Sequence, residues 1–184
     1  MNTVHETLLL GADYISTFPI LFFFVNMLEA AKQGNYIENL FFSFWMFKFN
    51  GLVYFIKRLP YPDYLLPITN RPLGASNCDL LSRNGPKEWG TPGFPSGHMT
   101  SAALFSVYKL MKLYKEKGEP NLKDFILENY QLIIFYLTII LATAWARYYK
   151  KCHNVTQIIG GTIFGTVAAI IFYHLYFNVI KKNN

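Results

Sequence analysis

The sequence predicts an all-α fold, an integral membrane bundle of about five to six transmembrane helices that forms a single domain over residues 1–184. Composition is the first observation behind this prediction. Hydrophobic residues make up 52% of the chain and charged residues only 15%, against roughly 25% charged in ordinary soluble domains. The second observation is that several long segments carry no charged side chain. The third is that proline and charge gather in the connections between these segments.

Five segments resemble bilayer-spanning helices, which need about 20 mostly apolar residues. They are Tyr14–Leu28, Asn39–Ile56, His98–Tyr114, Asn129–Ala146 and Asn154–Ile180. The first, fourth and fifth contain no Asp, Glu, Lys or Arg. The second is interrupted by Lys48, and the third contains Lys109 and Lys112 near one end, where long side chains reach the interface. A soluble bundle is the alternative, but the last segment is apolar on every side, which favours a membrane.

The positive charge of the chain does not indicate a nucleic-acid partner. The formal net charge is +6 and the pI is about 9.2, but the basic residues are dispersed between apolar segments instead of forming a stripe or an arm. They are better placed to contact anionic lipid headgroups of a bilayer. Cys78 and Cys152 lack the spacing of a metal site, and pairing of the two or two separate structural thiols both remain open.

Helices that alternate in direction place two polar segments on one side of the membrane, the loop at about 57–97 and the turn at 147–157. The loop contains Pro60, Pro62, Pro67, Pro72, Pro86, Pro92 and Pro95, so no long helix is expected there, and its apolar content favours a lid over a site. Lys and Arg are nearly balanced between the two sides, but once the basic residues of this loop and turn are set aside, the remaining excess on the opposite side favours that side as cytoplasmic: Lys32, Lys115, Lys117, Lys123, Lys181 and Lys182. We therefore expect the loop and the turn on the lumenal or external face.

The loop ends in Pro95-Ser96-Gly97-His98, directly before an apolar helix. Ser96 is expected at the helix start, where unpaired backbone amides and the helix dipole favour an anion such as phosphate. The alternative is an ordinary capped turn in which Pro and Gly supply the bend and Ser supplies the cap. From this segment alone the two interpretations are equally supported.

A second group of polar residues surrounds the turn between the last two apolar segments. Arg147 precedes this turn and His153 follows it. Gln157 lies four residues after His153, one helical turn further on, so its amide is expected to bind one ring nitrogen of His153 and to leave the other free to attack. The alternative is a basic interfacial loop, which is the expected role of Lys150 and Lys151.

These two segments resemble the second and third signature motifs of the type 2 phosphatidic acid phosphatase superfamily. The matching residues are Pro95-Ser96-Gly97-His98 and Arg147-(five residues)-His153, and the resemblance extends over about residues 50–161. It implies a membrane-embedded phosphatase domain that hydrolyses phosphoric esters or diphosphates without a metal or another cofactor. It also implies a phosphohistidine intermediate on His153, with His98 as the general acid. Ser96, the Gly97 amide and Arg147 would then hold the phosphoryl oxygens.

Two departures from the family pattern qualify this resemblance. Gln157 stands where the family commonly has Asp, although dolichyl pyrophosphate phosphatases are similar in carrying Gln there. A neutral partner orients the imidazole without stabilising its cation. The first motif, Lys-(six residues)-Arg-Pro, keeps only Arg71-Pro72, because Tyr64 occupies the lysine position. An insertion would let Lys57 supply the amine, so we expect Arg71 and Lys57 to bind phosphate.

The resemblance predicts a lipid phosphate substrate, either a phosphomonoester such as phosphatidic acid or an isoprenoid diphosphate. Its lipid tail would lie between helices while its headgroup reaches the motif loops. Two alternatives remain open, a phosphatase for a soluble phosphate ester and a non-catalytic protein that binds lipid phosphate. The sequence does not indicate an oligomeric state.

Overall fold

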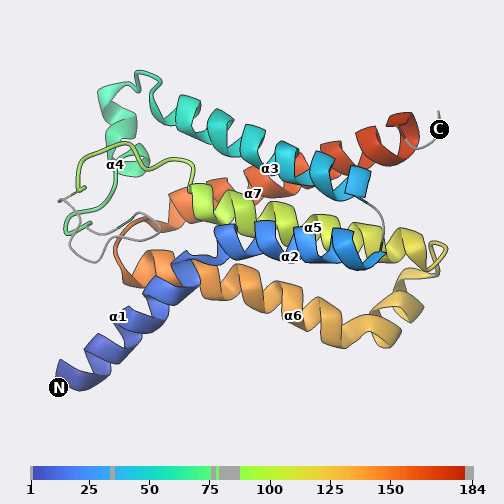
Figure 1. Ribbon diagram of the computed structural model, residues 1–184. Helices are drawn as coiled ribbons and strands as arrows, with labels where there is room; N and C mark the ends of the chain where they lie inside the picture. The colour runs from blue at the N-terminus through green and yellow to red at the C-terminus, as the bar shows by residue number, and fades with distance from the viewer. Residues whose placement is uncertain (1, 34–35, 76–77, 79–87, 181–184) are drawn as a thin grey trace.

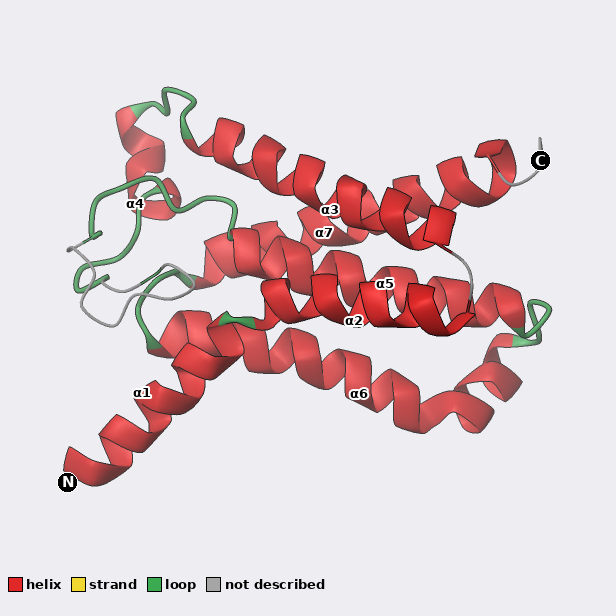
Figure 2. Ribbon diagram, viewed as in Figure 1, coloured by secondary structure: helices red, strands yellow, loops and turns green. Residues whose placement is uncertain are grey.

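The computed structural model is a helical bundle, and it describes residues 2–33, 36–75, 78 and 88–180 (Figure 1). Its long helices are α1 (Asn2–Ser16), α2 (Phe18–Gln33), α3 (Tyr36–Lys57), α5 (Gly97–Glu116), α6 (Leu122–Tyr149) and α7 (Val155–His174). The short elements are η1 (Asp63–Leu65), α4 (Leu66–Thr69) and a π-helical extension of α7, η2 (Leu175–Ile180). Figure 2 shows no strand among the described residues. The all-α prediction is therefore confirmed.

The predicted apolar segments correspond to helices of the structure, with one difference at the amino end. The segment expected over Tyr14–Leu28 does not form one straight helix, because α1 and α2 meet at Thr17 with a bend of 44°. α1 also includes residues that the apolar pattern did not assign to a helix. Inside α6, Asn129 has non-helical backbone angles (φ −119°, ψ 18°), which marks a kink near the start of the predicted fourth segment.

Fewer helices than expected meet a length and hydropathy criterion for crossing a membrane. Leu122–Tyr149 and Val155–Asn178 meet it, and Thr3–Ser16 with Phe18–Lys32 adds a third span if the bent pair is counted as one. The expected number of five to six spans is therefore not confirmed. Charged side chains lower the hydropathy of both α3 (Glu38, Lys48 and Lys57) and the second half of α5 (Lys109, Lys112, Lys115 and Glu116).

Several of those charges are buried and paired inside the bundle, at the end that joins α2 to α3. Lys112 on α5 lies 2.7 Å from the Glu38 carboxylate on α3, and Tyr108 donates a hydrogen bond to the same carboxylate. Lys109 forms an ion pair with Glu29 of α2. Buried charges are tolerated when they are paired in this way, so their presence in α3 and α5 is compatible with an apolar environment.

The outer surface of the bundle is apolar to a degree that is unusual for a protein in water. On α6 five large side chains each expose between 49% and 68% of their surface: Leu127, Ile134, Phe135, Leu137 and Leu141. Monomeric soluble proteins rarely expose contiguous apolar surface of this extent. The helices are therefore consistent with a protein that lies in a membrane.

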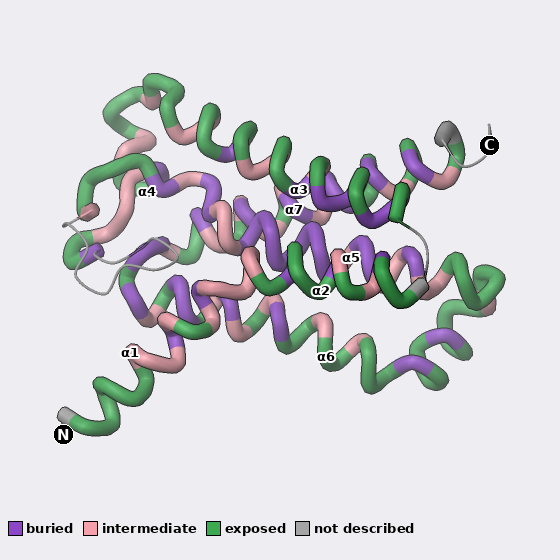
Figure 3. Tube along the Cα trace, in the orientation of Figure 1, coloured by how far each residue is buried: buried purple, intermediate pink, exposed green. Residues whose placement is uncertain are grey.

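α5 lies at the centre of the bundle and contacts α2, α3, α6 and α7 (Figure 3). Its packing against α7 depends on two glycines. A Cβ atom added at Gly161 would lie 2.5 Å from the carbonyl oxygen of Ser96, and one at Gly165 would lie 2.2 Å from that of Thr100. These two small residues thus allow the backbones of α5 and α7 to approach closely.

The loop between α3 and α5 and the turn between α6 and α7 lie at the same end of the bundle (Figure 1). The end of α2, the start of α3 and the link from α5 to α6 lie at the opposite end. This arrangement agrees with the alternation expected from the sequence. As a result, the proline-rich loop, the start of α5 and the turn before α7 meet in one region.

Candidate active site

Backbone hydrogen bonds join the Arg71 segment to the chain that leads into α5. The amide of Arg71 donates to the carbonyl of Thr91 at 2.8 Å, and the amide of Gly93 donates to the carbonyl of Thr69 at 2.7 Å. Asn70 and Pro92 form an isolated bridge between the two segments. The remnant of the first motif is therefore held beside the second motif.

Ser96 is the residue that caps α5, as the sequence predicts. Its side chain makes no capping hydrogen bond, and the buried Oγ atom has no hydrogen-bond partner among the described residues. The Nε2 atom of His98, in the first turn of the same helix, is likewise buried without such a partner. Buried polar atoms are nearly always satisfied, so these two atoms at a helix start are candidates to bind a polar ligand, and His98 also lines the cavity of the bundle.

His153 lies in the turn before α7, not at the start of the helix as predicted, because Asn154 caps α7. The predicted contact with Gln157 is nevertheless present, at 2.9 Å between Nδ1 of His153 and Oε1 of Gln157. The side-chain amide nitrogen of Gln157, Nε2, donates to the carbonyls of Asn70 at 2.7 Å and Ile68 at 3.1 Å. Its oxygen must therefore accept from an N–H at Nδ1, which leaves the lone pair of the imidazole on Nε2.

Gly93 makes room for this arrangement. A Cβ atom at residue 93 would lie 2.6 Å from Oε1 of Gln157, which is closer than real Cβ contacts come. The carbonyl of Gln157 also accepts a hydrogen bond from the amide of Ser96 at 3.1 Å. Thus Gln157 joins all three motif segments through its side chain and its backbone.

Arg147 is fully buried in the last turn of α6. One guanidinium nitrogen donates to the hydroxyl of Ser16 in α1 at 3.1 Å, and another donates to the carbonyl of Cys78 in the loop at 2.7 Å. Arg147 and Ser96 are absent from the walls of the cavity described next, whereas Arg71, Gly97, His98 and His153 line it. The structure therefore places Arg147 close to the site without exposing it to the cavity.

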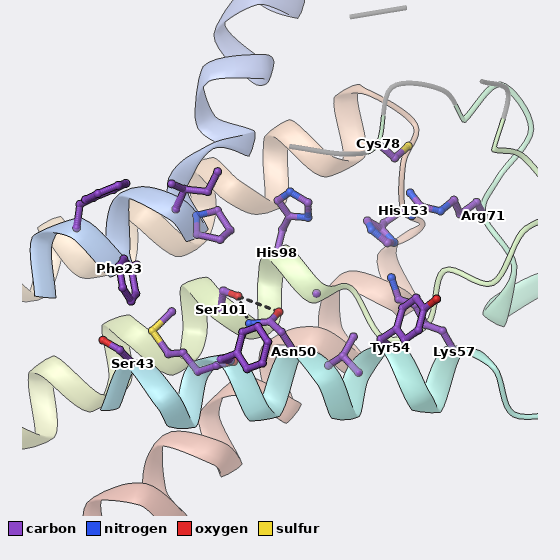
Figure 4. Close-up of a pocket in the computed structure, with 17 residues that line it drawn as sticks. Phe23, Ser43, Asn50, Tyr54, Lys57, Arg71, Cys78, His98, Ser101 and His153 are labelled. Carbon is purple, nitrogen blue, oxygen red and sulfur yellow. Dashed lines mark hydrogen bonds between the residues drawn. The ribbon is translucent and has the colours of Figure 1, made fainter. Parts of the chain in front are cut away.

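The cavity has a volume of about 680 Å³ and runs along α3 from the motif residues toward α2 (Figure 4). Its polar end is lined by His98, His153, Arg71 and Lys57. Lys57, the last residue of α3, lines the cavity, so its place agrees with the insertion hypothesis. Its other walls are mainly apolar and come from α2 and α3: Pro19, Ile20, Phe23, Phe24, Met46, Phe47, Val53 and Tyr54.

The polar end of the cavity carries strong positive potential. Burial lowers the pKa of His153 well below its ordinary value, and the charges of Arg147, Lys57 and Arg71 lower it further. The hydrogen bond with Gln157 opposes this effect only in part. His153 is therefore neutral near pH 7, which is the protonation state that a nucleophilic imidazole needs. Within the described part of the chain, no group of three or more His, Cys, Asp or Glu side chains is placed to hold a metal ion.

Two features of the site were not predicted from the sequence. Cys78 and Cys152 form a disulfide, which decides between the two possibilities that the sequence left open. Glu88 lies 3.3 Å from the guanidinium of Arg71 with a largely buried side chain, a pairing that the spacing of the loop carboxylates does not indicate. Of the other two carboxylates in this loop, Asp63 is exposed and Asp79 lies outside the described residues.

What this arrangement can do chemically is hold a tetrahedral oxyanion beside an oriented, neutral imidazole at the end of a helical bundle. These features define a class, the phosphate-ester hydrolases with a helical body. The family model described as the PAP2 superfamily matches residues 37–181, and the chain belongs to this superfamily. Searches of curated proteins and of solved structures find no match to the chain. Members of the superfamily are phosphatases, which supports hydrolysis of a phosphate ester here.

Proposed function

We propose that this protein hydrolyses a lipid phosphomonoester or lipid diphosphate and that it forms a phosphohistidine intermediate on His153. The observation that carries the proposal is the two-part lining of the cavity. Its cationic end fits a phosphate group, and its apolar walls fit a hydrocarbon chain. Phe47 and Tyr54 line it while exposing 77% and 57% of their surface, so the apolar part opens to the outside of the bundle between α2 and α3. A lipid tail could enter there from a bilayer.

In the first half of the reaction, Nε2 of His153 attacks phosphorus while the bond from phosphorus to the leaving oxygen breaks. His98 donates a proton to that oxygen as it leaves. Arg71, Lys57 and the amide of Gly97 bind the phosphoryl oxygens, on which negative charge must be stabilised in the transition state. In the second half, His98 accepts a proton from water, which attacks phosphorus and breaks the bond to nitrogen. Inorganic phosphate and neutral His153 result.

Ser96 and Arg147 contribute to phosphate binding in different ways, Ser96 by a direct hydrogen bond and Arg147 by its charge at longer range. The Ser96 hydroxyl, buried at the start of α5 without a partner among the described residues, would donate to a phosphoryl oxygen. Arg147 donates to Ser16 and Cys78, so its contribution is chiefly the positive potential that it adds beside His153. Both assignments follow from the resemblance to the family motifs and are refined by where the side chains lie.

We also propose that the active site faces the lumenal or external side of a membrane. The Cys78–Cys152 disulfide supports this orientation, since disulfides persist in oxidising compartments and are rare in the cytosol. The excess of lysine at the opposite end of the bundle agrees with it. A multi-pass arrangement in the bilayer is part of the same proposal.

The function is tested by phosphate release from purified protein in detergent without added metal. Phosphatidic acid, an isoprenyl diphosphate and glucose 6-phosphate separate the three substrate classes. His153→Ala and His98→Ala are compared with His174→Ala, a matched change at an exposed histidine near the end of α7. We expect lipid substrates to be hydrolysed, the first two variants to lose at least about 100-fold in kcat/KM, and the control to remain active.

Three outcomes would count against the proposal. Release from none of the substrates would favour a protein that only binds lipid phosphate. Release from glucose 6-phosphate alone would favour a phosphatase for soluble esters. Full activity of His153→Ala would exclude this residue as the nucleophile. Labelling with a substrate that carries ³²P in the transferred group should place acid-labile, base-stable phosphate on wild type and none on His153→Ala.

A further inference from the structure

The disulfide joins the proline-rich loop to the residue directly before the proposed nucleophile. Cys152 precedes His153 in the turn, and Cys78 belongs to the loop between α3 and α5, 74 residues earlier. The two Cα atoms are 5.4 Å apart, and both residues are almost fully buried, together with Ala75. Cys78 also lines the cavity, so the crosslink forms part of the wall of the site (Figure 4).

The backbone of Cys78 connects this crosslink to both arginines of the motifs. Its carbonyl accepts a hydrogen bond from Arg147 at 2.7 Å, and its amide donates to Oε1 of Glu88 at 3.0 Å. Oε2 of Glu88 lies 3.3 Å from the guanidinium of Arg71. Cys78 is therefore linked to both guanidinium groups, to that of Arg147 directly and to that of Arg71 through Glu88.

We propose that Cys78, Cys152 and Glu88 form a positioning unit that holds Arg71 and Arg147 at the phosphate site and makes activity depend on the oxidised disulfide. This inference rests on the proposed function, because it concerns the same site. None of the three side chains reacts with the substrate. Their role is to fix the positions of the groups that bind it.

The physical reason for such a unit is repulsion between like charges. The charges of Arg71, Arg147 and Lys57 all act on His153, so the site gathers cations in a region of low solvent access. A carboxylate whose side chain is 15% exposed offsets part of this repulsion and fixes the direction of Arg71, whose side chain is 10% exposed. The carbonyl of Cys78 fixes the direction of the Arg147 side chain, but only while the disulfide holds residue 78 against the turn.

Reduction of the disulfide is a balanced two-electron step with an external dithiol such as dithiothreitol. The sulfur–sulfur bond of the protein breaks, the two cysteines take up two protons and two electrons, and the reagent becomes a cyclic disulfide. Residue 78 is then no longer tied to residue 152, and the acceptor of Arg147 can move. A misplacement of about 1 Å in a phosphate-binding group can cost on the order of 100-fold in rate.

The first arm of the test compares oxidised protein, protein reduced with dithiothreitol and reoxidised protein, with the thiol content measured by alkylation and mass spectrometry. We expect reduction to lower kcat/KM for a lipid phosphate by about 10- to 100-fold and reoxidation to restore it. A variant with Cys78→Ser and Cys152→Ser should have the low activity of the reduced protein and should not respond to the reagent. Equal kcat/KM of fully reduced and oxidised protein would overturn the inference.

The second arm uses Glu88→Gln, which keeps the shape of the side chain and the acceptor for the Cys78 amide but removes the charge facing Arg71. Asp63→Asn is the matched control, since Asp63 is an exposed carboxylate of the same loop. If Glu88 positions Arg71, the glutamine variant loses about 10-fold in kcat/KM at unchanged thermal stability. If Glu88 only repels the phosphate, the variant binds phosphate more tightly and reacts faster, and the inference fails.

A third measurement separates this inference from the proposed function. Calorimetric titration with inorganic phosphate reports on the site without turnover, so it applies even if none of the chosen esters is a substrate. We expect the oxidised protein to bind phosphate about 10-fold more tightly than the reduced protein or Glu88→Gln. Inactivity of oxidised wild type with every ester would count against the proposed function. Equal phosphate affinity in all forms would count against the positioning unit alone.

Discussion

Replacement of Gln157 by Leu should separate the orientation of His153 from the rest of the site. Leucine is close to glutamine in size, so the change removes hydrogen bonds with little loss of volume. It deletes the 2.9 Å contact to Nδ1 of His153 and the donations to the carbonyls of Ile68 and Asn70. Gln157 is fully buried, so these groups lose their partners in a place that water does not readily reach.

Two magnitudes follow from these contacts. Leaving a buried polar group unsatisfied costs about 1–3 kcal/mol, and with three groups affected we expect a loss of about 3 kcal/mol or more in the free energy of unfolding. The effect on catalysis comes from the imidazole, which is no longer fixed in the tautomer that presents its lone pair at Nε2. Loss of a comparable orienting hydrogen bond costs about 10- to 100-fold in activity, and we expect kcat/KM to fall by this factor.

The assay is phosphate release at several substrate concentrations together with thermal unfolding of the same preparation. Gln131→Leu provides the control, because it is the same change at an exposed position on α6. The measurement is made below the midpoint of unfolding of the variant, so that only folded protein is compared. If Gln157→Leu stays within twofold of wild type in kcat/KM, the tautomer of His153 does not depend on Gln157 and the reasoning is wrong.

Three further predictions concern charge and packing. Because the pKa of His153 is lowered, the neutral nucleophile persists in acid, and the acid limb of kcat/KM against pH should lie below 6.5, where an ordinary histidine would place it. Lys57→Met should lower kcat/KM about 10-fold or more, while Arg58→Met, next to it but exposed, should not, as phosphate-release assays of both variants would test. Gly165→Ala should destabilise the protein by about 1–3 kcal/mol in thermal unfolding, because the new Cβ meets a backbone oxygen of α5, whereas Gly11→Ala meets no atom within 4 Å and should be tolerated.

Most of the features that the sequence predicted correctly depend on neighbours within a few residues. Ser96 at the start of α5 follows from Pro and Gly before an apolar run, and the contact from Gln157 to His153 follows from a spacing of four residues. The approach of the Arg71 segment to His98 and His153 was expected from the alternation of helix directions. Lys57 facing the cavity was a hypothesis about an insertion, and its position agrees with that hypothesis.

Specific side-chain contacts between distant segments could not be predicted from the sequence. Nothing local in the chain indicates that Ser16 would meet Arg147 from a helix at the amino end, or that Glu88 would face Arg71 instead of solvent. The bend at Thr17 was missed because the apolar pattern continues across it. In each case the partner is chosen by how the helices pack, and packing brings together residues far apart in the chain.

The sequence by itself determined that the chain is helical and apolar, where the residues that resemble the family motifs lie, and that His153 has an amide one turn away. Periodicity, composition and short spacings are local properties, so they can be read directly from the order of residues in the chain. Only the tertiary structure decided that Cys78 and Cys152 pair, that Arg147 is buried behind the site and that the cavity joins a cationic end to an apolar slot between α2 and α3. Each of these features depends on contacts between segments that are distant in the sequence, and such contacts form only when the helices pack together.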